Sequence, residues 1–390
     1  MDFDSVLDRR GTGSTKWDRM EAIYGVSPDD GIAMWVADMD FRSPDVITRR
    51  LKQEVETGLF GYSNIDTEYR DSICWWMQNR QGWTIEPDWI FTTTGIVNAV
   101  GLCLDVYTKP GDEIILFTPV YHAFARIIRA AGRKVRELPL AIRDGRFEMD
   151  FDAYDAMLSG SETMAILCSP HNPGGTVWRQ DELVALGDFA KKHDLMLVSD
   201  EIHHDLVFTG HKHIPMAKAD PSIIDRLLML TAPSKTFNVA GLHTGNVIIP
   251  DPDLRKRFAD RVTGLSLAGN SLGQIALMSA YSPEGAKWVD ALMAYLDENR
   301  RIFDDTINAI PGLSSMHLEA TYLSWVDFSA TGMSPREFLD RVEKTAKIAV
   351  NHGDSFGLGG EHCARFNIGT CRARVEDACA RLKDAFADLQ

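Results

Sequence analysis

The chain has 390 residues, enough for two or three domains and a large hydrophobic core. Hydrophobic residues make up 45% of it and charged residues 25%, values typical of globular proteins, which excludes the disordered, fibrous and membrane-embedded classes. The formal net charge of −15 repels phosphate backbones, so we expect no nucleic acid partner.

The compartment is predicted from the N-terminus and the cysteines. Residues 1–18 show no basic region followed by an apolar stretch, so they do not form a secretory signal. No apolar run approaches the roughly 20 residues of a membrane span. The six cysteines lack C-x-x-C spacing and are expected to be reduced thiols. We therefore expect a cytoplasmic protein without a membrane partner.

The order of elements predicts an α/β fold. Residues 1–45 are irregular and suggest an arm. From Trp89 onward, short apolar runs alternate with segments of helical periodicity, such as the helix expected over 179–194. Strands are expected at 89–93, 114–117, 164–168, 195–198 and 227–230. This alternation predicts a mostly parallel sheet covered by helices on both faces.

A different pattern begins near Pro283. A long helix is expected over 286–309, ended by the Pro-Gly pair at 311–312. Residues 321–326 then form a plausible strand of a smaller C-terminal α+β region. No internal repeat or low-complexity linker separates the two regions, so we expect them to pack closely.

Polar side chains follow the predicted strands at the edge where ligands bind in open parallel sheets. Tyr121, Asn172, Asp200 and Lys235 each come shortly after such a strand. After the first strand, Gly95, Ile96 and Val97 open a helix whose backbone N–H groups suit a phosphate.

Each of these residues has an ordinary explanation on its own. Tyr121 could be packing, Asn172 could shape a turn before a proline, Asp200 could cap a helix and Lys235 could be a surface lysine. Their joint placement on successive strand ends instead favours a binding site.

Pyridoxal 5′-phosphate (PLP) requires this set of groups: a lysine for the Schiff base, an acid beside the pyridine nitrogen and a phosphate cradle. Lys235 and Asp200 can supply the first two, and residues 95–97 with Ser234 the third. Asn172 can donate to the phenolic oxygen, and Tyr121 can stack on the ring.

At these residues the chain resembles the fold type I PLP enzymes of the aspartate aminotransferase superfamily, and within it the MalY/PatB group of cystathionine β-lyase-like C–S lyases. The shared motifs stand in this order: residues 35–41 (WVADMDF), 60–62 (FGY), 169–175 (SPHNPGG), 199–203 (SDEIH), 234–238 (SKTFN) and 364–367 (ARFN). The resemblance covers essentially the whole chain. It implies the aspartate aminotransferase fold, with an arm at 1–45 contributing to the small domain, a large PLP-binding domain at 46–285 and a small domain at 286–390.

The resemblance also assigns roles to residues. It implies catalytic roles for Lys235, Asp200 and Tyr121. Arg365 resembles the family's clamp for the substrate α-carboxylate, a task suited to a bidentate guanidinium. Tyr62 resembles the tyrosine that reaches the cofactor phosphate of the neighbouring subunit, which implies a homodimer with shared active sites.

Other positions complete or depart from the family pattern. Ala37 and Asn172 are expected to contact substrate, and His203 to form a wall of the cofactor site. Residues 241–245 (GLHTG) place His243 where typical class I aminotransferases carry a phosphate-binding arginine. The C–S lyase group also lacks that arginine, so this departure favours a lyase.

The resemblance implies a PLP-dependent C–S β-lyase acting on L-cystathionine or related cysteine S-conjugates, giving thiol, pyruvate and ammonia by α,β-elimination. An aminotransferase on the same scaffold is the alternative, since both share every cofactor residue named above. A regulatory protein that binds a partner through its surface is a third hypothesis.

Four histidines lie between positions 203 and 213 and could suggest a metal site. The adjacent pair His203-His204 does not share a face, as ligands would at i,i+4 spacing. We therefore expect no metal.

Overall fold

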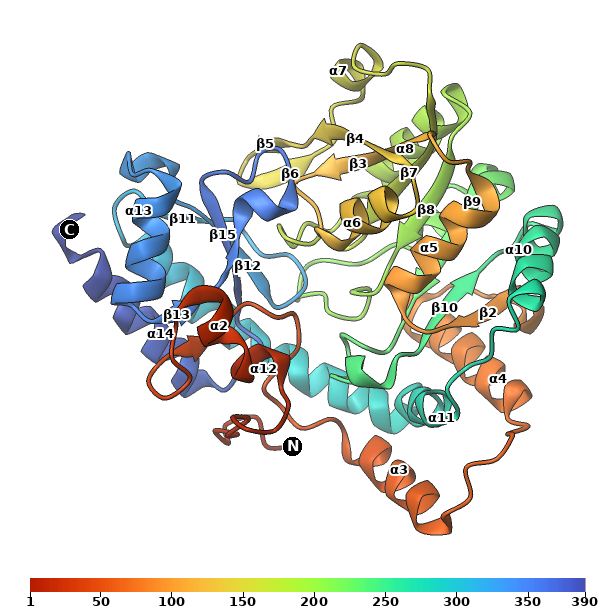
Figure 1. Cartoon of the computed structure of the whole chain (residues 1–390), viewed down its shortest axis with the longest axis horizontal. Coiled ribbons are helices and arrows are strands. Elements are labelled where there is room, and N and C mark those ends of the chain that lie inside the picture. Colours follow the sequence, from red (N-terminus) through yellow and green to blue (C-terminus); the bar gives the residue numbers. More distant parts are fainter. Residues whose placement is uncertain (390) are drawn as a thin grey trace.

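A seven-stranded sheet forms the centre of the larger part of the molecule (Figure 1). The computed structural model describes residues 1–389. Across the sheet the strands run in the order β2 (Ile90–Thr93), β10 (Gly245–Ile248), β9 (Leu227–Thr231), β8 (Met196–Asp200), β7 (Glu162–Cys168), β3 (Glu113–Thr118) and β4 (Lys134–Pro139). All neighbours pair in parallel except β10, which is antiparallel to both β2 and β9.

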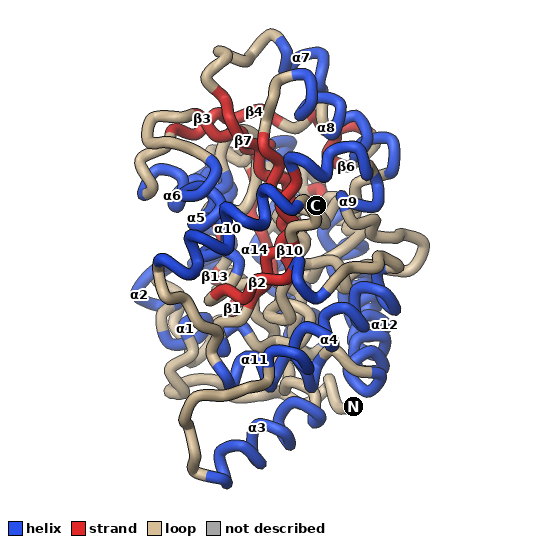
Figure 2. The backbone as a smooth tube through the Cα atoms, turned by 90° about the vertical axis from the view of Figure 1, so that its right-hand side faces the viewer, coloured by secondary structure: helices blue, strands red, loops and turns tan. Residues whose placement is uncertain are grey.

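The sheet is buried on both faces because successive side chains of each strand point to opposite sides. In β3, Ile114 and Leu116 pack into one hydrophobic core, and Ile115 and Phe117 pack into the other. Because both faces of the sheet are buried, β3, β7, β8 and β9 consist of nearly continuous apolar runs. Figure 2 shows the strands in the interior with helices around them.

The α-helices of this part of the molecule lie between residues 45 and 308. The core that contains Ile114 and Leu116 joins α5, α6 and α10 to one face of the sheet. The core that contains Ile115 and Phe117 includes residues of α4, α8, α9, α11 and α12. Their bounds are α3 Asp45–Thr57, α4 Asp66–Trp76, α5 Ile96–Tyr107, α6 Ala123–Ala130, α7 Phe151–Asp155, α8 Gln180–Lys192, α9 Met216–Ala219, α10 Pro252–Gly264, α11 Ser271–Ala280 and α12 Pro283–Asn308.

The sequence-based fold class is confirmed: the fold is α/β with a mostly parallel central sheet. All five expected strands are present, within a few residues of their predicted bounds. The expected long helix is α12, which begins at Pro283 because Ser282 caps it by accepting a hydrogen bond from the Gly285 N–H. The prediction missed β4 and β10, as well as the hairpin of β5 (Ala141–Arg143) and β6 (Arg146–Glu148).

The C-terminal region builds a second, four-stranded antiparallel sheet in the order β11 (Ser314–Ser315), β12 (Leu323–Asp327), β15 (Cys363–Asn367) and β14 (Asn351–His352). Helices α13 (Pro335–Asp340) and α14 (Arg372–Ala385) lie in the same region, and α14 packs on α12. The expected strand at 321–326 corresponds to β12.

The first 45 residues are less irregular than expected. They form two short helices, α1 (Thr15–Asp18) and α2 (Met20–Tyr24), and strand β1 (Ile32–Ala33). Strand β1 pairs in parallel with β13 (Ile348–Ala349), so the arm lies against the C-terminal region. Within residues 1–389, no helix is long and apolar enough to cross a bilayer.

The central strand β8 offers a test of this core, because Leu197 is fully buried there three residues before Asp200. Leu197→Ala should lower the free energy of unfolding by about 2–5 kcal/mol, since a cavity would remain between sheet and helices. Urea unfolding followed by circular dichroism measures this change. Lys256→Ala on the exposed face of α10 is the control and should have little effect; equal effects of the two changes would contradict the buried position.

Candidate active site

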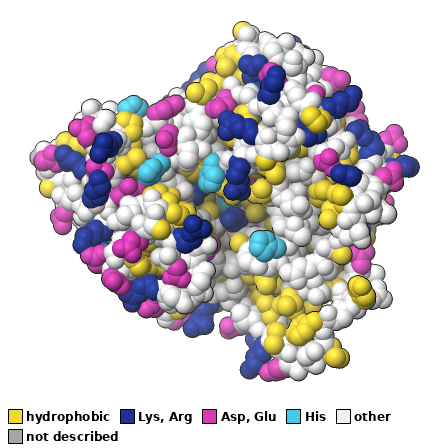
Figure 3. Space-filling view, in the orientation of Figure 1, with side chains coloured by type: hydrophobic (Ala, Val, Ile, Leu, Met, Phe, Trp, Pro, Cys, Tyr) yellow, Lys and Arg dark blue, Asp and Glu magenta, His cyan; other side chains and the backbone are white. Residues whose placement is uncertain are grey.

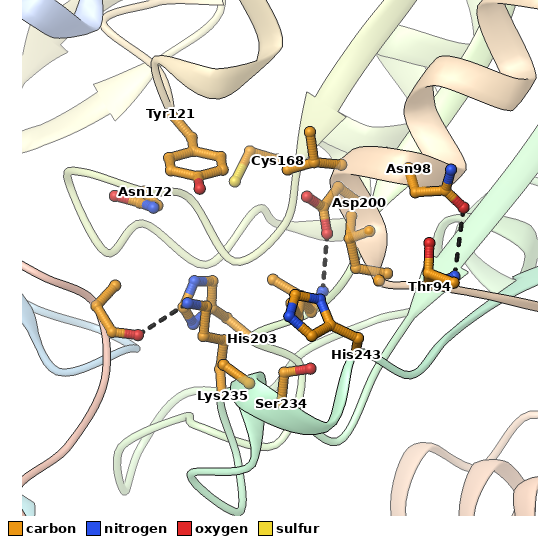
Figure 4. A pocket seen from close by; sticks show the side chains of 16 residues that line it. Thr94, Asn98, Tyr121, Cys168, Asn172, Asp200, His203, Ser234, Lys235 and His243 are labelled. Atoms are coloured by element: carbon orange, nitrogen blue, oxygen red, sulfur yellow. Dashed lines mark hydrogen bonds between the residues drawn. The ribbon is translucent and has the colours of Figure 1, made fainter. Parts of the chain in front are cut away.

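A cavity of about 280 Å³ lies at the edge of the large sheet where the parallel strands end (Figure 4). Figure 3 shows a hollow in the surface between the C-terminal region and the rest of the molecule, with basic and histidine side chains around it. The cavity is lined by most of the residues expected from the sequence: Ala37, Gly95, Ile96, Val97, Tyr121, Asn172, Asp200, His203, Ser234 and Lys235.

The backbone at the start of α5 forms one end of the cavity. Gly95 is the N-terminal cap of α5 and has φ 104°, a conformation that favours glycine. Strand β10 passes close to this backbone, because a Cβ added to Gly245 would lie 3.2 Å from Gly95, whereas the space around the Gly95 Cα is open. Helix α5 therefore presents its free N–H groups to the cavity, beside Ser234 and His243.

Asp200 ends strand β8 with its carboxyl group at the cavity. The side chain is 3% exposed and accepts one hydrogen bond, from the Ile202 N–H at 3.1 Å. Within residues 1–389 no cationic side chain forms an ion pair with it. Burial therefore raises the pKa of Asp200 to about 7. The site thus holds an acid that lacks a positive partner.

Lys235 projects into the same space from the loop after β9. Its Nζ donates a hydrogen bond to the Ala37 carbonyl at 2.8 Å. Burial and the nearby charge of Arg365 lower the pKa of this amine to about 8, although Asp38 and Asp200 oppose the change. A lysine in this environment is partly neutral near physiological pH, as a nucleophile or proton acceptor must be.

Arg365 does not line the cavity but reaches it through Asn172. Its Nη1 donates to Asn172 Oδ1 at 2.9 Å, and its Nη2 donates to the Trp35 carbonyl at 2.8 Å and to Asn351 Oδ1 at 2.5 Å. Its Nε is buried and has no hydrogen-bond partner in the described chain. Burial lowers the pKa of Arg365 to about 10. This guanidinium can donate hydrogen bonds to the carboxylate of a ligand, whose negative charge would offset the energetic cost of burying the arginine.

Tyr62 lies outside this constellation. It is fully exposed on the loop between α3 and α4, and it is not among the described residues that line the cavity. The structure of one chain therefore does not bring Tyr62 to the group of residues predicted with it.

Other lining residues were not predicted as site residues: Thr94, Asn98, Cys168, Ile202, Ala240 and His243. Cys168 and Ile202 could have been found, since Cys168 ends strand β7 and Ile202 follows Asp200 at the end of β8. Asn98 lies in the first turn of α5 and Ala240 begins a short 3₁₀ helix, and neither position carries a distinctive sequence signal.

The histidines divide between two places. His203 faces the cavity. His204 Nε2 lies 3.2 Å from Asp205 Oδ2, and His213 Nε2 lies 2.8 Å from Glu201 Oε2, so these two rings bind carboxylates outside the cavity. Among the described residues, no group of three His, Cys, Asp or Glu side chains is placed to hold a metal ion.

Comparison with known proteins identifies the family of the chain. Residues 31–382 match the family model of aminotransferase class I and II. The chain belongs to this family.

Individual relatives are similar over their full length. Cystathionine beta-lyase PatB of Bacillus subtilis (strain 168) is 39% identical, with 99% of this chain and 100% of that protein covered. A PLP-bound putative aminotransferase from Clostridium difficile 630 is 36% identical with a TM-score of 0.94, covering 99% of each chain. The PLP-bound C–S lyase from Staphylococcus hominis is 30% identical with a TM-score of 0.90, covering 99% of this chain and 98% of that one. The family resemblance stated from sequence motifs is thereby confirmed.

The raised pKa of Asp200 predicts a pH-dependent stability of the cofactor-free protein. The folded chain favours the protonated form of Asp200. The free energy of unfolding is therefore highest below the unfolded pKa near 3.8, and it falls as the pH rises through the folded pKa of about 7. Relative to wild type, Asp200→Asn should therefore raise the melting temperature more at pH 8 than at pH 5.

Differential scanning fluorimetry of the cofactor-free protein at the two pH values measures this difference. Asp188→Asn, at an exposed position of α8, is the control and should leave the difference between pH values unchanged. A melting temperature of Asp200→Asn that falls below wild type at pH 8 would contradict an uncompensated buried carboxylate.

Proposed function

We propose that the chain is a PLP-dependent C–S β-lyase that acts on L-cystathionine or related cysteine S-conjugates and releases a thiol, pyruvate and ammonia. The observation that carries the proposal is the convergence of Lys235 and Asp200 on one cavity, with Arg365 bonded to the lining residue Asn172. The chain is also 39% identical to a cystathionine beta-lyase over its whole length.

The residues present fit PLP. An acid without a cationic partner matches a ring nitrogen that must stay protonated, which Asp200 would favour through its negative charge. The N–H groups at Gly95, Ile96 and Val97, with Ser234, would hold the phosphate. Tyr121 would stack on the ring and Asn172 would donate to its phenolic oxygen. When bound, PLP supplies an electron sink for the substrate α-carbon.

The chain's own groups then have separable tasks. Arg365 binds the substrate α-carboxylate and orients the amino acid, with Asn172 beside it. Ala37 contributes a backbone carbonyl to the substrate side of the cavity. Lys235 Nζ holds the cofactor in the resting enzyme and, once free, accepts the α-proton, a role that its lowered pKa suits. His203 is a buried, neutral wall, because burial keeps its pKa well below the ordinary value.

An aminotransferase remains the alternative function, favoured by the description of the matching family and of the similar Clostridium difficile protein. Every residue assigned above would serve both reactions. His243 in place of a phosphate-binding arginine supports the lyase instead.

The surface supports a homodimer with shared active sites. On the loop after α3, Leu59 is 82%, Phe60 64% and Tyr62 111% exposed, an unusual concentration of large apolar side chains in water. A second copy of the chain would cover them and bring Tyr62 to the phosphate end of its partner's cavity. We also propose a cytoplasmic location, which the free state of all six cysteines supports, and retain the division at residues 45 and 285 as the domain boundaries.

The lyase and aminotransferase proposals differ in their need for a keto acid. With L-cystathionine or a cysteine S-conjugate and no added keto acid, the enzyme should release pyruvate, ammonia and thiol over many turnovers. A lactate dehydrogenase-coupled assay and a thiol reagent measure these products, and Lys235→Ala is the inactive control. Turnover that appears only with a keto acid, without thiol release, would establish the aminotransferase.

Mixing experiments test the shared site. Lys235→Ala and Tyr62→Phe homodimers should each have reduced activity, and a mixed dimer should regain about one site in which both native residues meet. Purification with two affinity tags isolates the mixed dimer. Activity of the mixed dimer that merely equals the mean of the two parents would contradict a Tyr62 contribution across the interface.

A further inference from the structure

A buried ion pair connects two segments of the arm, the short helix α1 and residues 35–41. Lys16 is 0% exposed and Asp40 1% exposed, and Lys16 Nζ lies 3.1 Å from Asp40 Oδ2. Asp40 Oδ1 also accepts hydrogen bonds from Trp17 Nε1 at 3.0 Å and from Arg9 Nη1 at 2.9 Å. Arg374 Nη1 also lies 3.5 Å from Asp40 Oδ2. Although burial opposes ionisation, Lys16, these donors and Arg374 hold the pKa of Asp40 below its ordinary value. Asp40 is therefore a charged anchor for the arm.

Lys16 holds residues 35–41 at more than one point. Besides the ion pair with Asp40, its Nζ donates to the Asp38 carbonyl at 3.1 Å. Its own backbone carbonyl accepts a hydrogen bond from Trp35 Nε1 at 2.8 Å. These contacts lie on both sides of Ala37. Together with the Asn367 amide, which donates to the Val36 and Asp38 carbonyls, they hold the peptide between them.

Ala37 connects this anchor to Lys235. Its carbonyl accepts hydrogen bonds from Lys235 Nζ at 2.8 Å and from the Tyr322 hydroxyl at 3.0 Å. The neighbouring Asp38 carboxylate stabilises the charged amine through space. Residues 35–41 thus present both a hydrogen-bond acceptor and a negative charge to Lys235.

The buried pair is a weak source of stability, which makes a positional role the better explanation. Removing water from two charges offsets much of their attraction, so neutralising both partners of a buried pair is often tolerated. Neutralising only one partner leaves a buried charge without compensation and is destabilising. The two residues should therefore be changed together.

We propose that Lys16 and Asp40 are positioning residues for Lys235: they hold residues 35–41 so that the Ala37 carbonyl and the Asp38 carboxylate face its amine. This inference rests on the proposed PLP chemistry of Lys235. It assigns the arm a part in setting when the amine is reactive.

The proposal predicts the direction in which the pKa of Lys235 should change. Arg365 of β15 and the buried ring of His203 face Lys235 together with Asp38 and Asp200. Of these groups, only Asp38 belongs to the segment that Lys16 and Asp40 hold. Loosening that segment withdraws the carbonyl acceptor and the nearby negative charge, both of which favour the charged amine. The pKa of Lys235, about 8 in the native chain, should therefore fall further.

The rate at which the cofactor-free chain takes up PLP tests this, because only the neutral amine condenses with the aldehyde, forming a carbon–nitrogen double bond and releasing water. The visible absorbance of the lysine-bound cofactor reports the rate. Its pH midpoint should lie near 8 in wild type and about 0.5 to 1 unit lower in Lys16→Met/Asp40→Asn, as expected for one weakened hydrogen bond and charge contact. Steady-state KM for the lyase substrate should rise about 3- to 10-fold in the same variant because Ala37 also lines the cavity.

The control is Asp8→Asn/Arg10→Met, which neutralises an exposed ion pair of the same arm and should change neither value. Circular dichroism checks the fold of each variant. If the double variant does not fold, Trp17→Phe removes one donor to Asp40 and should shift the midpoint in the same direction by a smaller amount.

An unchanged midpoint and KM in a folded variant would overturn the positioning role while leaving the PLP proposal intact. The failure of the PLP proposal is distinguishable, since wild type itself would then form no lysine-bound cofactor.

Discussion

The buried carboxyl group of Asp200 is the constraint on which the rest of the cavity depends. It sits at the end of the central strand β8, which lies between β7 and β9 in a sheet that carries a hydrophobic core on each face. A carboxylate in such a place is unfavourable unless a positive charge compensates it. Within residues 1–389 no cationic side chain forms an ion pair with it, although Lys235 acts on it through space. A cationic ligand would therefore stabilise the charged form. PLP, with a protonated ring nitrogen, meets this requirement, as the family of the chain implies.

Burial also disfavours the charged forms of the two basic residues at the site, Arg365 and Lys235. Arg365 and Lys235 are both buried, and each has a pKa below its ordinary value. Arg365 is satisfied in part by Asn172 and by the Trp35 carbonyl, and it retains a buried Nε for a substrate carboxylate. The α-carboxylate of an amino-acid substrate would supply a negative charge to Arg365.

Much of this arrangement could be predicted from the sequence, for a physical reason. Strands β7, β8 and β9 are buried on both faces, so they appear as uninterrupted apolar runs, and the residues that follow them must meet at one edge. Asp200 and Lys235 were found by this rule. Strand β10 was missed because its four residues, Gly245–Ile248, include glycine and asparagine, and β4 was missed because its exposed edge position allows charged residues.

Contacts between segments that are far apart in the sequence could not be predicted from local sequence patterns. The bond between Lys235 and Ala37 spans 198 positions, and the bond between Arg365 and Asn172 spans 193. The ion pair of Lys16 and Asp40 connects two segments that both look irregular in the sequence. The proposed place of Tyr62 in the site of a neighbouring subunit follows from neither the local pattern nor the single-chain fold.

The central claim is that one particular lysine carries the cofactor, and chemical trapping tests it most directly. Borohydride reduces the carbon–nitrogen double bond between a lysine and PLP to a stable single bond, which survives proteolysis. Peptide mass spectrometry of the reduced holoenzyme should find the pyridoxyl modification on Lys235, stoichiometric with the chain and absent from the other lysines. A modification on another lysine, or none at all, would contradict the account.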